Sequence, residues 1–482
     1  MAKVVDLTPS DAGTGIPTRI DDDNEFNLLN SRKIEAKKDE IPTICQEVGI
    51  IFNIAIRIGF SVLFELGPIF MATIFMGHLP DPQSVLSGTG LARTFSNVTG
   101  TGLAWGFTSG LWQLIPKAMN ESSRIGLRTY IQRAFYVTSM IMIFATIIQF
   151  FGGDIMCFIG SGANPPLCDS VDKNIITNYC RILIPYIWGM TWLTIMQRVG
   201  QSLQLNTELL YVVFVPFCLA IPLNWLLLFY FNIGYIGTGI VINISIFLSC
   251  ILCIILLCYK GYYDIFIPLP LSLTLFNYNG LFEYFKLSYP GCFQIGLSWF
   301  VRELMTILSA YIVNPKLAIS VTVVSSSLNI LFVLGEGICN GLTLRVGKYI
   351  QNNNEYLAKR VIKISFLMEF IFLVVLVTLF LYFRYNIARL WTYDEEIINL
   401  VSNIIFIVVI RQTTIGIYMN ISGIYRGLGF QKIGSWTMAT CNYLIAMPIN
   451  IVLLFALKFK DNIKLGLYTI WGTCSFGYIL GT

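Results

Sequence analysis

Residues 221–229 read IPLNWLLLF, and residues 447–455 read MPINIVLLF. Each stretch follows an arginine–glycine step about one helix upstream, Arg198-Val199-Gly200 in the first case and Arg426-Gly427 in the second. Both stretches lie within long apolar segments, and their separation is close to half of the 482-residue chain. A membrane protein built from two similar halves is typical of secondary transporters, in which the substrate passes between the halves.

The composition indicates a chain embedded in a membrane. Hydrophobic residues make up 55% of the sequence and charged residues only 12%, whereas a soluble globular domain contains about 25% charged residues. The mean hydropathy is +0.69. We therefore expect an all-α polytopic membrane protein with the lipid bilayer as its surroundings. The net charge of +5 is small and spread over loops, so nucleic acid is not an expected partner.

Apolar segments of about 20 residues, the length that crosses about 30 Å of hydrocarbon, follow one another along the chain. The twelve expected spans are 49–76, 84–115, 129–151, 175–196, 207–231, 235–258, 284–311, 317–343, 361–383, 398–424, 434–456 and 463–481. An even number of spans puts both termini on one side. The loops on that side carry about twice as many Lys and Arg residues as the opposite loops, which predicts that both termini are cytoplasmic.

The spans divide the chain into two lobes. Residues 1–48 are polar and charged and are expected to form a soluble, disordered cytoplasmic tail without a signal peptide. The predicted N-lobe covers 49–259 and the C-lobe 284–482. Residues 260–283, which include Pro268 and Pro270, are the expected cytoplasmic linker between the lobes.

Several short motifs resemble the multidrug and toxin extrusion (MATE) transporters, in particular their eukaryotic branch. They are Met76-Gly77-His78-Leu79, Asn97-Val98-Thr99-Gly100, Tyr130-Ile131-Gln132-Arg133-Ala134, Gly234-Tyr235-Ile236-Gly237, Leu344-Arg345-Val346-Gly347, Tyr425-Arg426-Gly427-Leu428-Gly429 and Gln431-Lys432-Ile433-Gly434. The resemblance covers about residues 50–480. It implies two pseudo-symmetric six-helix bundles that form a V around a central cavity. It also implies export of small organic solutes against a proton or sodium gradient, with the proton favoured.

A carboxylate inside the bilayer is costly, so each one is a candidate for ion coupling. The resemblance places Glu303 in the seventh span, facing the cavity of the C-lobe. Trp299 lies four residues earlier and therefore on the same helical face, where an aromatic ring beside a carboxylate suits an organic cation. The alternative is that Glu303 pairs with a neighbouring arginine for a structural reason.

Other polar residues within the spans are secondary candidates. Glu336 lies in Gly335-Glu336-Gly337, which we interpret as a flexible point in the eighth span. Glu65 precedes Pro68, where a bend and a polar pocket would suit a protonation site, although pairing with Arg57 or Arg93 is an equal alternative. Asn97 and Thr99 are expected to face a cavity in the N-lobe, and Glu369 has a weaker claim.

The sequence departs from the family pattern at several acidic positions. Ser298, Ser326, Ile415 and Trp112 stand where acidic residues are expected, Lys117 replaces a glutamine, and Arg302 stands where tyrosine is frequent. Five arginines also lie within spans, where a charge must pair, reach water or extend to an interface: Arg57, Arg93, Arg181, Arg302 and Arg411. A less acidic, more basic cavity leaves organic anions open as substrates.

Metal and redox sites are not expected. The single histidine, His78, ends the first span at the outer face and is interpreted as an interfacial residue rather than a pH sensor. Cys250 and Cys253 lie within a span, where cysteine behaves as a small hydrophobic residue. Cys157 and Cys168 flank an expected external loop, and whether they form a disulfide remains open at this stage.

The favoured function is a proton-coupled antiporter that exports organic cations or xenobiotics, acts as a monomer, and needs no cofactor or metal. Alternatives are an exporter of organic anions or conjugates, a channel or lipid flippase on a related scaffold, and a transport-dead relative with a binding or regulatory role. No P-loop is present and nothing indicates an enzyme. The plasma membrane is the favoured location, with vacuolar or lysosomal membranes as alternatives.

Overall fold

The computed structural model describes residues 42–111, 114–115, 118, 124–203, 205–262, 278–428 and 430–482. Every element in these residues is helical. The tail up to residue 41, linker residues 263–277, Trp112 and Lys117 lie outside the described residues.

The helices of the first half follow the expected spans closely. They are α2 (Ile44–Met76); α3 (Pro82–Ser96), continued by η1 (Asn97–Thr101), α4 (Gly102–Phe107) and η2 (Thr108–Gly110); α6 (Arg124–Phe150); α7 (Gly152–Ile159), η3 (Gly160–Gly162) and α8 (Leu167–Ser170); α9 (Lys173–Ile182) and α10 (Ile184–Ser202); α11 (Asn206–Trp225) with η4 (Leu226–Tyr230); and α12 (Tyr235–Tyr259).

The second half repeats this order. Its helices are α14 (Tyr278–Ser309); α15 (Pro315–Ser327), η5 (Leu328–Phe332) and α16 (Val333–Gln351); α17 (Glu355–Tyr382); α18 (Arg384–Trp391); α19 (Glu395–Gly427); α20 (Gln431–Ala439), η6 (Thr440–Ala446), α21 (Met447–Ile451) and η7 (Val452–Ala456); η8 (Phe459–Asp461); and α22 (Ile463–Gly481). In the described residues, eight helices are long and apolar enough to cross a membrane. Helical segments 82–110, 173–202, 278–309 and 463–481 occupy the other four expected spans.

Two structural details confirm the internal repeat. The quoted stretches both end in a π-helical turn, η4 beginning at Leu226 and η7 at Val452, which is the same offset as between the sequences. The second and eighth long helical runs, which begin with α3 and α15, start alike: Asp81 and Asn314 are left-handed N-caps with φ of 51° and 56°, and each precedes a proline.

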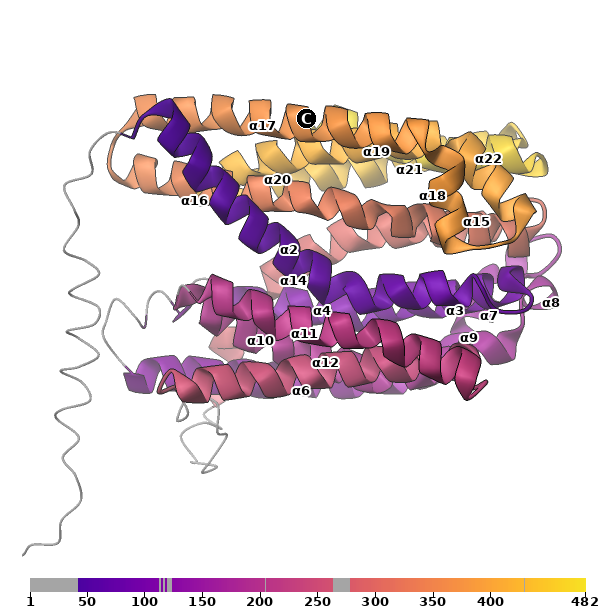
Figure 1. Cartoon of the computed structure of the whole chain (residues 1–482), viewed down its shortest axis with the longest axis horizontal. Coiled ribbons are helices and arrows are strands. Elements are labelled where there is room, and N and C mark those ends of the chain that lie inside the picture. The colour runs from indigo at the N-terminus through magenta and orange to yellow at the C-terminus, as the bar shows by residue number, and fades with distance from the viewer. Residues whose placement is uncertain are drawn as a thin grey trace, which may run out of the picture.

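Helix α2 passes from one half of the molecule to the other. Its first part packs against α16, where a Cβ on Gly337 would lie only 2.1 Å from the Ala55 carbonyl oxygen. Its second part packs against α11, with the ring centroids of Phe64 and Phe217 5.1 Å apart. Figure 1 shows α2 crossing from the layer of α16 and α17 to the layer of α3 and α11.

Helix α14 makes the reciprocal crossing. Near its start the Tyr284 hydroxyl donates to the Phe107 carbonyl at 2.8 Å, and a Cβ on Gly106 would lie 2.5 Å from the Cα of Cys292. Further along, Phe300 stacks on Tyr443 of η6. We call α3–α12 the N-bundle and α15–α22 the C-bundle; α2 and α14 each pack against both.

Direct contacts between the bundles gather at the end of the molecule that holds Asp81, which we call the Asp81 face. The Lys316 ammonium lies 3.0 Å from both Asp81 carboxylate oxygens, and the Gln83 amide donates to Asp394 at 2.9 Å. A Cβ on Gly77 would overlap the Trp391 carbonyl oxygen at 1.8 Å. His78 ends α2 here, with its ring edge on Tyr393.

The opposite end, which we call the Pro42 face, holds a buried ion pair. Helix α2 begins at Ile44, before the expected start at 49, because Thr43 and Gln46 form a capping box. Glu47, which was expected to belong to the soluble tail, is fully buried. Its carboxylate accepts hydrogen bonds from Arg345 at 2.6 and 2.7 Å and from the Tyr349 hydroxyl at 2.8 Å.

One disulfide closes the loop region at the Asp81 face. Cys157 of α7 and Cys168 of α8 are bonded, with Cα atoms 5.6 Å apart, which settles the pairing that the sequence left open. Cys250 and Cys253 are buried and not bonded to each other; the Cys250 thiol donates to the Gly189 carbonyl.

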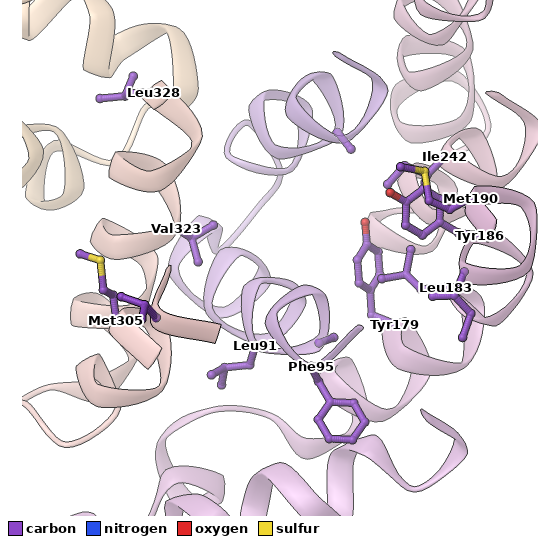
Figure 2. Close-up of a cluster of buried hydrophobic side chains, with 14 of the residues drawn as sticks. Leu91, Phe95, Tyr179, Leu183, Tyr186, Met190, Ile242, Met305, Val323 and Leu328 are labelled. Carbon is purple, nitrogen blue, oxygen red and sulfur yellow. The ribbon is translucent and has the colours of Figure 1, made fainter. Parts of the chain in front are cut away.

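A continuous apolar core joins the bundles through α3. Figure 2 shows Leu91 and Phe95 of α3 between Met305 and Val323 on one side and Tyr179, Leu183 and Tyr186 on the other. All belong to one cluster of buried side chains. Small residues allow this close approach, since a Cβ on Gly90 would lie 2.2 Å from a Val323 methyl carbon.

We predict that Arg345→Met destabilises the protein by about 3–5 kcal/mol, because it leaves the Glu47 carboxylate buried without its cation. Thermal unfolding of the purified protein in detergent measures the effect. Lys359→Met is the matched control: it breaks a pair with Glu355 in which both side chains are about three-quarters exposed, and roughly 0.5 kcal/mol or less is expected. Equal shifts for the two variants would contradict the prediction.

We also predict that the Asp81–Lys316 contact does not titrate near neutral pH. Partial burial alone would raise the pKa of Asp81, but hydrogen bonds from Lys316 and the Ser84 amide outweigh it and hold that pKa below the ordinary 3.8. Because the pKa of Asp81 is lowered, the contact contributes fully to the free energy of unfolding at any pH above the ordinary pKa. This contribution is lost as the pH falls through the lowered pKa. The difference in unfolding temperature between wild type and Asp81→Asn should therefore stay flat between about pH 5 and 8. A difference that disappears within that range would refute the assignment.

Candidate functional site

The structure brings Glu303 of α14 against the N-bundle. The Asn97 amide of η1 donates to the Glu303 carboxylate at 2.9 Å, joining residues 206 positions apart in the chain. The Thr94 hydroxyl of α3 is a second hydrogen-bond partner. No ion pair closer than 4.0 Å in the described residues includes Glu303. Its hydrogen-bond partners are therefore neutral groups, while Arg302 and Arg93 interact with it electrostatically without forming an ion pair.

Two indole rings and a guanidinium lie next to this carboxylate. The Trp299 ring centroid is 5.3 Å from that of Trp105 on α4. The Arg302 guanidinium lies over the Trp299 ring at 4.3 Å and remains exposed. We call Asn97, Trp105, Trp299, Arg302 and Glu303 the Glu303 cluster. It combines a carboxylate with a cation–π surface, and the N-bundle and the crossing helix α14 contribute to it.

A π-helical turn presents Asn97 to Glu303. Residues Asn97–Thr101 form η1 between α3 and α4, and such wide turns are frequent at functional sites because they redirect side chains. Thr99, two residues on, points elsewhere. Its hydroxyl contacts the Gln149 amide oxygen of α6 at 2.9 Å, so Asn97 joins Glu303 whereas Thr99 belongs to a polar contact inside the N-bundle.

Glu65 lies in a second polar site, beside α10. Its carboxylate accepts a hydrogen bond from the Gln197 amide at 3.0 Å, while its other oxygen is buried without a hydrogen-bond partner. A cavity lined by Glu65, Pro68 and Tyr186 has a volume of about 10 Å³, enough for one water molecule. Most of the lining is apolar, and its polar groups come from Glu65, Tyr186, Ser245 and Ser249.

The suggested pairing of Glu65 with Arg57 or Arg93 is wrong. Arg57 is exposed, and the Arg93 guanidinium donates to the Thr73 hydroxyl at 2.9 Å. The cation that interacts electrostatically with Glu65 is instead Arg198, which also interacts with Glu336. Arg198 belongs to the arginine–glycine step of the repeat, so the sequence contained a signal for it, although not for its partner.

Glu336 faces the crossing of α16 and α2, but its flanking glycines have a different role from the one expected. Gly335-Glu336-Gly337 is regular α-helix within α16, and the relaxed geometry lies earlier, in the 3₁₀ segment η5. Position 337 requires glycine because a Cβ atom there would collide with the Ala55 backbone. The two glycines therefore serve close packing rather than flexibility.

Two in-span charged residues that the sequence pointed to less strongly, Arg411 and Glu369, lie buried in the C-bundle. Arg411 is 1% exposed, and its guanidinium contacts the Gln412 side chain and the Trp471 ring. Glu369 of α17 is 3% exposed and lies against Gly416 of α19. Gly416 follows Ile415, the position where the tenth span was expected to carry an acid.

Two other positions at which the sequence departs from the family pattern, Ser326 and Ile415, have structural roles. The Ser326 hydroxyl donates to the Val323 carbonyl of its own helix, and Ile415 packs against the core. The side chain of Ser298 lies outside the described part of the chain. Within that part, no three His, Cys, Asp or Glu side chains gather in a way that could hold a metal ion.

Comparisons with known proteins agree with this architecture. The MatE family model matches residues 58–226 and 290–452. Protein DETOXIFICATION 13 of Arabidopsis thaliana is 26% identical over 393 residues, covering 81% of this chain and 79% of the relative. Protein DETOXIFICATION 14 of the same plant is 24% identical over 416 residues, covering 85% and 82%.

Solved structures show the same fold. The crystal structure of the eukaryotic MATE transporter AtDTX14 superposes with a TM-score of 0.72 at 22% identity, covering 91% of this chain and 94% of that one. An inward-facing multidrug resistance MATE family transporter superposes with a TM-score of 0.73 at 15% identity, covering 90% and 95%. The two matched repeats span most of both halves, and the chain belongs to the MatE family of multi-pass membrane transporters of the multidrug and toxin efflux kind.

Proposed function

We propose that this protein exports small organic cations in exchange for protons and that Glu303 is the coupling carboxylate. The observation that carries the proposal is the Asn97–Glu303 hydrogen bond of 2.9 Å beside the Trp105–Trp299 pair. A carboxylate at the boundary between the bundles can act on both of them. Trp299 offers an aromatic face to a cation that the carboxylate attracts.

Competition at this carboxylate supplies the coupling. Ionised Glu303 attracts an organic cation, which must displace the Asn97 amide to approach closely. A proton on Glu303 removes that attraction and also weakens the charge-assisted bond from Asn97. Proton and cation therefore exclude each other. Each change also alters a contact between the N-bundle and α14, the helix that packs against both bundles, and such a contact can link ion occupancy to alternating access.

The orientation belongs to the same proposal. The Pro42 face carries Arg345, Lys348, Lys359, Arg360 and Lys363 around the turn between α16 and α17, so we assign this face to the cytoplasm. The Asp81 face is then external, and its bundle-to-bundle contacts form a closed outer gate. The substrate would enter from the cytoplasm in this state, in a monomer located in the plasma membrane.

Organic anions are a second candidate because of Arg302. Its exposed guanidinium is held by the Trp299 ring, where it could bind a substrate carboxylate in a bidentate manner. An anion that uses Arg302 would not require Glu303 to be ionised. The two candidates therefore differ in which of these neighbouring residues controls uptake.

We predict that Glu303→Gln abolishes uptake driven by a pH gradient. The assay uses proteoliposomes with an imposed gradient and either a tetraethylammonium-type cation or citrate. Cation uptake should fall by roughly ten- to a hundredfold, since a charge-assisted interaction worth about 1.5–3 kcal/mol is lost. Glu283→Gln, an exposed carboxylate on the same helix, is the matched control and should keep wild-type uptake.

Citrate uptake that persists in Glu303→Gln and disappears in Arg302→Gln would overturn the cation assignment and favour the anion candidate. Transport of neither compound by well-folded wild-type protein would favour a transport-dead relative.

We also predict that Trp299→Ala raises the KM for the cation about 2- to 30-fold, the range that corresponds to a cation–π contribution of about 0.5–2 kcal/mol. Trp299→Phe should retain part of the affinity because a ring remains. Trp436→Ala, which removes a 65% exposed indole from α20, should leave KM unchanged. An unchanged KM in Trp299→Ala would remove this residue from the site.

A further inference from the structure

A carboxylate in the C-bundle has no visible role in the Glu303 cluster. Glu369 of α17 is 3% exposed, and its Oε2 atom is buried without a hydrogen-bond partner. No Lys or Arg of the described chain forms an ion pair with it. Burying an ionised carboxylate without a partner costs several kcal/mol or more. Glu369 therefore needs a proton or another bound cation to remain where it is.

Two glycines on neighbouring helices make room for this carboxylate. A Cβ on Gly416 of α19 would lie 2.6 Å from Glu369 Oε1, and a Cβ on Gly335 of α16 would lie 2.9 Å from the same atom. Neither position could carry a larger residue without moving the carboxylate. The carboxylate thus lies where three helices of the C-bundle meet, and α14 with Glu303 is not one of them.

Two further polar side chains with unsatisfied atoms lie one turn away. Ser365 precedes Glu369 by four residues on α17, and Asn420 follows Gly416 by four on α19; both are fully buried. The helices run in opposite directions, so both residues lie about 6 Å from the Glu369 level on the side of the Pro42 face. The Ser365 hydroxyl and both polar atoms of the Asn420 amide lack hydrogen-bond partners.

Asn420 differs from the other buried asparagines of the described chain, because both polar atoms of its amide lack partners, whereas Asn224 and Asn442 leave only the oxygen unsatisfied. Buried hydroxyls such as that of Ser249 donate to the carbonyl four residues earlier, and the Asn224 and Asn442 amides do the same. Ser365 and Asn420 use no such bond. Unsatisfied buried polar groups call for an explanation, and bound water or an ion is the usual one.

Polar groups continue from this layer toward the Pro42 face. Cys339 of α16 is one turn from Gly335, and its thiol donates to the Met419 carbonyl at 2.8 Å. The Arg426 guanidinium lies 2.8 Å from the same sulfur. The titratable and charged groups on α16 and α19 within about three turns of the Glu369 level include Glu336, Cys339, Arg411, Tyr418 and Arg426, and Lys363 precedes Glu369 by six residues on α17.

We propose that Glu369, with Ser365 and Asn420, forms a second proton-binding site inside the C-bundle, separate from the Glu303 cluster and reached from the Pro42 face. The carboxyl holds the proton, while Ser365 and Asn420 hold the water that delivers it. Proton binding at this site does not depend on the proposed function, whereas its use in transport rests on that function. In the exchange cycle it would add one proton to the one carried by Glu303.

Infrared spectroscopy of the purified full-length protein tests the site directly, because a protonated carboxyl has a C=O stretching band separate from that of a carboxylate. At neutral pH we expect a component of this band that is lost in Glu369→Gln and retained in Glu303→Gln. Asn420→Ala and Ser365→Ala should shift the component in frequency or in its pH midpoint. Unfolding curves for each variant establish that it is folded.

Two results would overturn the proposal. A band identical in wild type and Glu369→Gln would mean that Glu369 carries no proton. Loss of the Glu369 component on adding NaCl at constant pH would make the site a Na⁺ site. Uptake in proteoliposomes separates this inference from the proposed function: a Glu369 component without pH-driven uptake would contradict only the function, and pH-driven uptake without that component would contradict only the second site.

Discussion

The cost of placing a carboxylate in a medium of low dielectric constant governs how this chain uses its buried acids. Four of them are stabilised in three ways. Glu47 is fixed by a guanidinium through two short hydrogen bonds. Glu303 and Glu65 are held by single side-chain amides, Asn97 and Gln197. Glu369 forms no ion pair within the described residues, and its Oε2 atom is buried without a hydrogen-bond partner. An amide stabilises a charged and a protonated carboxyl more evenly than a guanidinium does. The guanidinium partner of Glu47 therefore suits a permanent link, and the amide partners of Glu303 and Glu65 suit exchangeable sites. The lack of a partner at Glu369 suits a carboxyl group that keeps a proton.

The two crossing helices explain why charge at the exchangeable sites can matter to the whole molecule. Glu65 lies on α2 and Glu303 on α14, and each of these helices packs against one bundle at its start and the other further along. A shift of either helix therefore changes its contacts with both bundles. Each helix also contains a proline within its length, Pro68 or Pro290, which permits a bend without loss of the helix on either side. A change of charge on such an element can therefore bias the relative position of the bundles directly.

The sequence predicted those features that depend on local pattern and missed those that depend on distant partners. Apolar length gave the spans, and the repeated IPLNWLLLF and MPINIVLLF stretches end in matching π-turns at Leu226 and Val452. The early start of α2 was missed because Glu47 reads as a surface charge until Arg345, 298 residues away, is placed beside it. Glu65 was assigned arginine partners by helix spacing, but its partner Gln197 comes from α10. Glu369 was ranked low because nothing near it in sequence reveals that Gly335 and Gly416 leave space for its carboxylate.

The contacts at the two faces differ in what it takes to separate the bundles. At the Asp81 face the links join one bundle directly to the other, and Asp81 and Lys316 are partly exposed; exposed pairs contribute about 1 kcal/mol or less each. At the Pro42 face the strongest link, Glu47 to Arg345, ties the start of α2 to the C-bundle and need not break if that segment moves with the C-bundle. Opening at the Asp81 face would thus break several weak contacts, whereas opening at the Pro42 face would bend α2 and α14 while leaving the buried ion pair intact. Both movements avoid exposing an unpaired buried charge, which is the condition for a cycle that runs reversibly at modest energetic cost.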